Sequence, residues 1–521
     1  MKKFQSSLVL ACSALALASC GGDEIVSPGT SGDINVDITN PAPTPTPTPT
    51  PTSSLVTPAA GCPTINSTGG LTDAGTITGP TGTYRVCSLP ALFDADDTLP
   101  FIAGLLYSLP GRVDIGADRG FSSTGSTVEL TIQPGVTVFG GTGRSFLVAN
   151  RGNQLIANGS ATRPIVFTSR DNVLGLSNDS SIGQWGGVVL LGRGRVSDCR
   201  AGGINTDAAP NANPQCEQEL EGATTTTLFG GANNADNSGS LQYVQIRYSG
   251  FSLAPGNELQ SLTTGGIGSG TTIRYLQTHN SSDDGMEFFG GAVNIKNVIA
   301  TGADDDSFDV DTGAQANLQY VIGVQRTGGG DSLIELDSAD SASRPVASRP
   351  QTVFNVANFT FVQRSSASSQ SVRANGGAKL NLINGVIDSD GDPCIRIDDA
   401  PTFAADPDYF SVVGDCSATR PNRGGDTAPT DAQVQSDFVA DSSANNSGFT
   451  ISLTGVIVNG TNETGVTATN PTTISSFFDA TTYIGAVRNA QDTWYRDWTC
   501  NSATVDFGSA AGLCTRIPVY S

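Results

Sequence analysis

The strongest constraint on the fold of this chain is a short pattern that occurs three times between residues 283 and 337. Each copy starts with an aspartate, and a second acidic residue follows four positions later with an apolar residue on each side. The copies start at Asp283, Asp305 and Asp331, so their starts are 22 and 26 residues apart. Alternating apolar and acidic residues indicate a β-strand, and a repeat of about this length indicates strands stacked as coils of a parallel β-solenoid.

Aligning the copies predicts which side chains stack from coil to coil. Two looser copies begin at Val372 and Ile395. The inner columns are then Met286, Phe308, Ile334, Val372 and Ile395, and next to them Phe288, Val310, Leu336, Ala374 and Ile397. The outer column is Glu287, Asp309, Glu335, Arg373 and Arg396, with Asp311, Asp337, Asn375 and Asp398 beside it.

Length and composition agree with an all-β solenoid. The 521 residues include 62 glycines, and only 15% of the residues are charged. A chain of this length is too long for one ordinary globular core, whereas the core of a solenoid grows along one axis. The many glycines, serines, threonines and asparagines suit strands and turns and argue against a helical protein.

The charge balance is strongly acidic, with 49 aspartates and glutamates against 27 lysines and arginines. Such a surface repels the phosphates of nucleic acids and anionic lipid headgroups, so we expect no nucleic-acid partner. It attracts cations, and calcium is the cation expected outside a cell. The alternative interpretation is that the acidity only keeps an exported protein soluble.

The first twenty residues have the pattern of an export signal. Lys2 and Lys3 precede an apolar run over residues 8–18, and Leu17-Ala18-Ser19-Cys20 forms a small-residue cleavage site. This end resembles the bacterial lipobox, which implies that Cys20 becomes the first mature residue and carries the lipid. Gly21 stands where an aspartate would retain such a protein in the inner membrane, so we expect an outer-membrane anchor. An ordinary signal peptide with a chance cysteine is the alternative.

The rest of the chain divides by composition. Alternating threonine and proline up to Thr52 predict an extended polyproline II tether, which cannot pack a core. We therefore predict a signal peptide over 1–19, a disordered tether over 20–60, an N-terminal cap over 61–125, the β-helix with loop excursions over 126–460, and a disulfide-stapled C-terminal cap over 461–521.

Eight cysteines follow the signal, an even number, as oxidised exported proteins usually have. Residues distant in sequence lie far apart in a solenoid, so we predict that sequential neighbours form disulfides. The predicted couples are Cys62 with Cys87, Cys199 with Cys216, Cys394 with Cys416, and Cys500 with Cys514. No couple has the spacing of a zinc finger.

Two parts of the chain resemble known proteins. Residues 146–168 are similar to the opening coils of bacterial right-handed parallel β-helices. The segments 241–250, 262–268, 283–291 and 304–311 resemble exported lipoproteins that are common in Bacteroidetes and Alphaproteobacteria. Their likeness to type II-secreted lipoproteins of stalked alphaproteobacteria, made under phosphate starvation, implies a surface-exposed or released binding or accessory module. Its expected role is nutrient acquisition, with a secreted phosphatase or a surface protein as partner.

The stacked acids are candidate calcium ligands. Stacked strands lie about 4.8 Å apart, and two carboxylates at that distance repel each other by about 3 kcal/mol at an effective dielectric near 20. Bound cations, protonation or neighbouring arginines must relieve this repulsion. We predict a calcium site among Asp283, Asp284, Asp305, Asp306, Asp309 and Asp311. The alternative is that these residues form turns and a solvated face.

The alternative hypothesis is that the protein is a polysaccharide lyase or glycosidase of the β-helix type. This hypothesis depends on the same acids. Neighbouring coils can place two carboxylates at the separations that glycosidases need. Asp283 and Asp284 resemble the acid pair of polygalacturonases, but those enzymes also place a histidine on another coil. The one histidine, His279, lies four residues before Asp283. It is a candidate base, although a turn residue is the favoured interpretation, and we name no catalytic residue.

Overall fold

A computed structural model of the chain describes residues 56–122, 127–141, 144–197, 199, 215–222, 225–251, 258–338, 350–364, 370–389, 391–417, 429–508 and 512–520. Contacts divide the chain into residues 1–53 and 54–521, and all described residues belong to the second unit. The predicted signal peptide, Cys20 and the tether as far as residue 55 lie outside the described residues.

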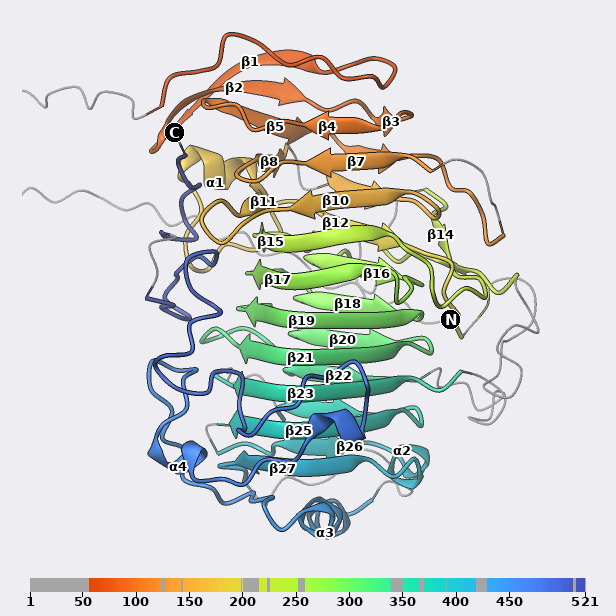
Figure 1. The fold of residues 1–521 in the computed structure, drawn as a ribbon, viewed down its shortest axis with the longest axis vertical. Coiled ribbons are helices and arrows are strands. Elements are labelled where there is room, and N and C mark those ends of the chain that lie inside the picture. Colours follow the sequence, from red (N-terminus) through yellow and green to blue (C-terminus); the bar gives the residue numbers. More distant parts are fainter. Residues whose placement is uncertain are drawn as a thin grey trace, which may run out of the picture. The chain divides into compact units, whose positions relative to one another are not determined.

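Two stacks of strands, drawn in Figure 1, form the coils. The order of the longer sheet is β1 (Thr72–Gly79), β2 (Gly82–Ser88), β5 (Leu105–Leu109), β8 (Thr137–Gly140), β11 (Ile165–Ser169), β15 (Gly239–Arg247), β17 (Thr272–His279), β19 (Ala292–Thr301), β21 (Gln315–Val324), β23 (Val353–Val362), β25 (Lys379–Asp388) and β27 (Asp408–Gly414). It also includes β4 (Asp97–Leu99), β7 (Glu129–Ile132) and β10 (Gln154–Asn158). Only the first pair, β1 with β2, is antiparallel among the described strands of this sheet.

The shorter sheet is parallel throughout its described strands and carries the acidic pattern. Its order along the coils is β3 (Leu92–Phe93), β6 (Arg112–Ile115), β9 (Phe146–Ala149), β12 (Gly187–Leu191), β16 (Leu262–Gly265), β18 (Met286–Phe289), β20 (Phe308–Asp311), β22 (Ile334–Leu336), β24 (Val372–Ala374) and β26 (Ile395–Ile397). A small antiparallel pair, β13 (Gln218–Glu219) and β14 (Leu228–Phe229), lies in an excursion between coils. The predicted all-β parallel β-helix is therefore confirmed.

From β15 onward, each coil joins two strands of the longer sheet into one bent strand. β10 pairs with the first half of β15 and β11 with its second half, and Tyr243 lies between the halves with a φ of 51°. The same register position in later coils also has φ between 51° and 61°, at Tyr275, Asn297, Tyr320, Asn358, Asn384 and Ser411. Left-handed backbone is unfavourable for most residues, and asparagine tolerates it best.

The register of the shorter sheet agrees with the predicted columns. Glu287 pairs with Asp309, Asp309 with Glu335, Glu335 with Arg373, and Arg373 with Arg396. The apolar neighbours form the predicted inner columns, and nearly all of these side chains are fully buried. The one-to-one register holds because a shift of one residue would turn every apolar side chain outward.

Short helices lie at the turns and at the end of the coils: α1 (Arg170–Leu174), α2 (Ala400–Ala404), α3 (Asp431–Asp441), α4 (Thr461–Thr464) and a 3₁₀ turn over Pro471–Thr473. α3 covers the last coil, where the ring of Phe438 packs on that of Tyr409 at 5.3 Å. No helix among the described residues is both long and apolar enough to cross a membrane.

Residues 442–508 and 512–520, here called the C-terminal strap, run back along the side of the coils (Figure 1). Side-chain amides of three strands each bind both main-chain polar groups of one strap residue. Asn384 on β25 binds Thr469 in this way, Gln319 on β21 binds Asp479, and Gln277 on β17 binds Cys500. These contacts lead the strap from the last coils back to β17, and beyond them Ile517 packs with Ile77 of β1 and Tyr84 of β2 at the first coils.

The strap and the early coils change the predicted boundaries. The described residues of 461–508 and 512–520 contact the side of the β-helix, because their partners are strand side chains, and do not close one end as a cap. The coils also begin inside the predicted N-terminal cap, at β2, and the last strand of the coils is β27. The four predicted disulfides are all present, and each joins the expected neighbours.

A candidate cation site on the shorter sheet

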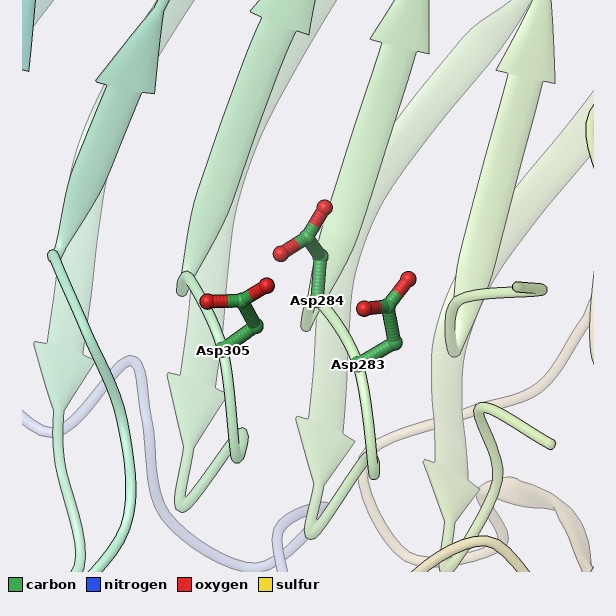
Figure 2. A group of neighbouring side chains, drawn as sticks. All are labelled: Asp283, Asp284 and Asp305. Carbon is green, nitrogen blue, oxygen red and sulfur yellow. The ribbon is translucent and has the colours of Figure 1, made fainter. Parts of the chain in front are cut away.

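The candidate site lies where the turns enter β18, β20 and β22. Asp283 and Asp284 precede β18, Asp305 and Asp306 precede β20, and Asp331 precedes β22. Parallel strands in register place these positions on successive coils, one strand spacing apart. Figure 2 shows Asp283 and Asp284 on one turn and Asp305 on its neighbour, with the three carboxylates gathered together.

Three groups of carboxylates are close enough to share an ion. Within each group the nearest carboxylate oxygens all lie within 4.8 Å of one another. The groups are Asp283 with Asp284 and Asp305; Asp284 with Glu287 and Asp309; and Asp305 with Asp306 and Asp331. Because Asp284 and Asp305 each belong to two groups, the three groups form one continuous acidic cluster across three coils.

Main-chain contacts hold two of these aspartates in place. Asp284 Oδ1 accepts a hydrogen bond from the backbone N–H of Asp306 at 2.9 Å, and Asp306 Oδ1 accepts one from Ser332 at 2.5 Å. Gly285 allows the coils to approach, since a Cβ at this position would lie 2.7 Å from the carbonyl oxygen of Ser307. Each of these two aspartates keeps a second oxygen that the bond to the next coil does not use.

The inner part of the cluster is buried. Asp284, Asp306 and Glu287 are only 5%, 3% and 6% exposed. The Oδ1 atom of Asp309 is buried and has no hydrogen-bond partner among the described residues. A buried carboxylate oxygen without a partner is costly, and a cation is one way to satisfy it.

Burial and mutual repulsion raise the pKa values of these carboxylic acids, so they stay protonated to a higher pH than usual. Burial, with the charges of Asp305 and Glu258, raises the pKa of Asp283 to about 7. Burial and the charge of Asp331 raise the pKa of Asp305 to about 6. The pKa values of four deeper acids are raised well above their usual range, mainly by burial: Asp284, Glu287, Asp306 and Asp309.

The arginines of the outer column do not neutralise the negative charge of the whole cluster. Arg373 binds Glu335 at 2.6 Å and Asp398 at 2.9 Å, and Arg396 also binds Asp398. The positive charges therefore balance the last coils of the column. The coils of β18 and β20 are left with the acids described above.

Two residues of the cluster, Glu287 and Asp331, were not among the predicted ligands. Asp331 occupies the same pattern position as Asp283 and Asp305, so the repeat itself could have identified it. Glu221 lies outside the three groups, but its charge acts on Asp283 and Glu287. It comes from the excursion before β14, and burial together with Glu258 and Asp311 raises its pKa to about 7. No local signal in the sequence places Glu221 beside these coils. Of the predicted ligands, Asp311 alone lies outside the three groups.

His279 is buried inside the protein. It is the last residue of β17 and not part of a turn, its side chain is 0% exposed, and its Nδ1 lies 3.0 Å from Thr301 Oγ1. Burial and the charges of Arg247 and Arg326 lower its pKa to about 3. A neutral, fully buried imidazole has no access to an external substrate, so His279 is not a candidate base.

Comparison with known families agrees with this architecture. A family model described as the pectate-lyase-like β-helix domain matches residues 119–499. The chain belongs to this family. The matched part of this β-helix domain contains the whole acidic cluster, and family membership is compatible with a binding role and with a lyase. No curated protein and no solved structure matches the chain significantly.

Proposed function

We propose that this β-helix protein is a lipid-anchored, surface-exposed or released protein that binds calcium on its acidic cluster. It acts as a non-catalytic binding or accessory module in nutrient acquisition. The observation that carries the proposal is the set of three carboxylate groups, each with its oxygens within 4.8 Å, on successive coils. Resemblance to phosphate-starvation lipoproteins supports phosphate as the nutrient and a secreted phosphatase as the partner.

The spacing of the oxygens favours calcium over magnesium. Calcium binds oxygens at about 2.3–2.6 Å, so two of its ligands lie up to about 5 Å apart. Magnesium binds at about 2.1 Å in a strict octahedron and keeps several waters. Carboxylate oxygens at separations up to 4.8 Å therefore suit the larger ion.

A calcium ion here would still offer positions to an external ligand. Asp283 and Asp331 are half-buried and Asp305 is exposed, so the outer groups of the cluster open to solvent. Because calcium takes six to eight oxygens, three carboxylates leave positions for water or for the oxygens of an anionic ligand. Binding through such an ion needs no catalytic residue.

A polysaccharide lyase or glycosidase is the second candidate. Family membership is compatible with it. The observation that favours it is the pKa of Asp283, which lies near neutrality because of burial and of the charges of Asp305 and Glu258. A carboxylic acid with a pKa near the working pH is suited to proton transfer. Its neighbours Asp284 and Asp305 supply the second acid that such chemistry needs.

Calorimetric titration of the mature chain with calcium tests the first proposal. We expect calcium binding that Asp284→Asn combined with Asp305→Asn abolishes, because these two residues together belong to all three groups. Asp506→Asn, at an exposed strap position, should leave binding unchanged. Wild-type protein that takes up no calcium would refute the proposal. Release of new reducing ends from acidic or neutral polysaccharides, lost in Asp283→Asn with the fold intact, would establish the enzymatic alternative.

A further inference from the structure

Two segments lie side by side on the outer side of the first coils, near the end of the β-helix where the coils begin (Figure 1). They are residues 170–176, which contain α1, and residues 512–520 of the C-terminal strap. Asn172 Nδ2 donates a hydrogen bond to the carbonyl oxygen of Cys514 at 3.0 Å, and Val173 packs in one cluster with Ile517. Figure 1 shows α1 and the C-terminal end of the chain close together beside β8 and β11.

These two segments expose apolar side chains to solvent. Leu176 is 65% exposed, Leu513 is 53% exposed and Val519 is 45% exposed. Among the described residues, only Leu92 and Val439 are other large apolar side chains with comparable exposure. Single exposed apolar residues are ordinary. Here, three of the five exposed large apolar side chains lie on two segments that are joined by a hydrogen bond, which is what a surface for an apolar partner requires.

The charge of these segments differs from that of the rest of the chain. Arg170 and Arg516 are both exposed, and Asp171, the one acidic residue of the two segments, is half-buried. The whole chain has a formal net charge of −22. A locally positive, apolar surface on an acidic protein suits an anionic, apolar partner, because the remaining surface is repelled by the same partner.

The chain also enters the described structure at this end. Val56, the first described residue, packs against the cluster that contains Val173 and Ile517, and its carbonyl oxygen accepts a hydrogen bond from Thr83. The preceding segment leads back to Cys20, the residue expected to carry the lipid. An anchored chain would therefore reach the folded body beside α1.

We propose that this end of the β-helix lies against an anionic lipid bilayer. We call it the α1 face and define it as Arg170, Leu176, Leu513, Arg516 and Val519. The three apolar side chains would enter the boundary between headgroups and acyl chains, and the two guanidinium groups would contact lipid phosphates. The contact would orient the coils on the membrane instead of leaving them free on the tether.

Vesicle flotation tests the α1 face without relying on lipidation. The chain from residue 20 onward, with Cys20→Ser, is mixed with phosphatidylethanolamine–phosphatidylglycerol vesicles or with phosphatidylcholine vesicles. A calcium chelator is present, so that the acidic cluster cannot bridge to lipid and a failure of the calcium proposal cannot affect the result. We expect flotation with the anionic vesicles and about tenfold weaker partitioning with phosphatidylcholine, because the arginine contacts are lost.

Matched variants separate the α1 face from other exposed apolar residues. Leu176→Ser, Leu513→Ser and Val519→Ser together should lower partitioning into anionic vesicles at least tenfold, whereas Leu92→Ser with Val439→Ser should not change it. Circular dichroism confirms that each variant is folded. The proposal is overturned if the unlipidated chain does not float, or if both variants float equally. It is also overturned if sedimentation shows that the triple variant changes self-association and leaves vesicle binding intact.

Discussion

Gln277 holds the main chain of Cys500 with both ends of its side-chain amide. Its Oε1 accepts from the backbone N–H of Cys500 at 2.8 Å, and its Nε2 donates to the carbonyl oxygen of Cys500 at 3.1 Å. Both residues are buried and lie 223 positions apart in the sequence. Both hydrogen bonds are to the main chain of Cys500 and neither is to its side chain. They hold the strap against a coil in the middle of the β-helix.

Replacing this amide should loosen the strap. Gln277→Leu leaves a buried N–H and a buried carbonyl of Cys500 without partners, and each such loss costs about 1–3 kcal/mol. We expect the free energy of unfolding to fall by about 2–6 kcal/mol, measured by urea denaturation. Hydrogen exchange should increase first around residue 500. Gln491→Leu, at an exposed strap position, is the control and should change stability little.

Removing the disulfide of the strap should have a similarly local effect. Cys500 and Cys514 close a loop with a sequence separation of 14, and a disulfide around a loop of this size contributes about 3 kcal/mol. Arg247, which is 1% exposed, also donates to the carbonyl oxygens of Cys514 and Arg516. We expect Cys500→Ser with Cys514→Ser to make the strap sensitive to protease while the circular dichroism of the coils persists. Equal protection of the strap in both proteins would contradict this.

Without calcium, the acidic cluster should make the protein less stable as the pH rises. In the folded protein the pKa values of Asp283 and Asp305 are raised to about 7 and about 6, mainly by burial. The folded state therefore binds more protons than the unfolded state between about pH 4 and pH 7. The stability contributed by these protonated acids is complete below about pH 4 and is lost as the pH rises through 7.

Thermal unfolding in a chelator checks the pH dependence, and we expect the Tm to fall from pH 5 to pH 8. Added calcium should restore the Tm most strongly above pH 7, because calcium binds the deprotonated carboxylates. A Tm that rises with pH in the chelator would contradict the assigned burial of the cluster.

Neutralising Asp284 and Asp305, the two aspartates that the carboxylate groups share, should uncouple stability from calcium. At a calcium concentration 100 times the Kd, wild-type protein should gain about 2.7 kcal/mol of stability. Asp284→Asn with Asp305→Asn should remove this gain, because each of the three carboxylate groups then loses a ligand. It should also stabilise the calcium-free protein, because the unfolded state can no longer gain free energy by releasing the protons of these two acids. Asp311→Asn should keep most of the gain, since Asp311 lies outside the three carboxylate groups. Thermal unfolding with and without calcium provides the measurement.

The helix α3, which covers the last coil, provides a test of what protects the edge of that coil from solvent. Phe438 on α3 packs on Tyr409 of β27, and both side chains are buried. Phe438→Ala should lower the free energy of unfolding by about 3 kcal/mol and expose the edge of the last strand. Val439→Ala, at an exposed position on the same helix, should have little effect on chemical denaturation.

The stacking of the shorter sheet could be predicted from the sequence because it depends on a local pattern. Phe308 and Val310 flank Asp309 in one strand, and the same alternation in the next coil leaves one register that buries every apolar neighbour. The pairing of sequential cysteines followed from the same one-dimensional geometry. The predicted positions of Asp283, Asp284, Asp305 and Asp306 on adjoining turns were a consequence of this register.

Other features depend on contacts that no local pattern encodes. The amides of Gln277, Gln319 and Asn384 look like ordinary polar strand residues until the strap lies beside them. Glu221 brings a further charge close to the acidic cluster from an excursion. The helix α3 covers the last coil from a segment without a strand pattern.

By itself, then, the sequence determined the coil, its register and the column of acids, because periodic burial of apolar residues admits one solution. Only the tertiary structure decided the path of the strap, the burial of His279 and the membership of the acidic cluster. These depend on where distant segments meet, and the exclusion of water there sets both the hydrogen bonds and the pKa values.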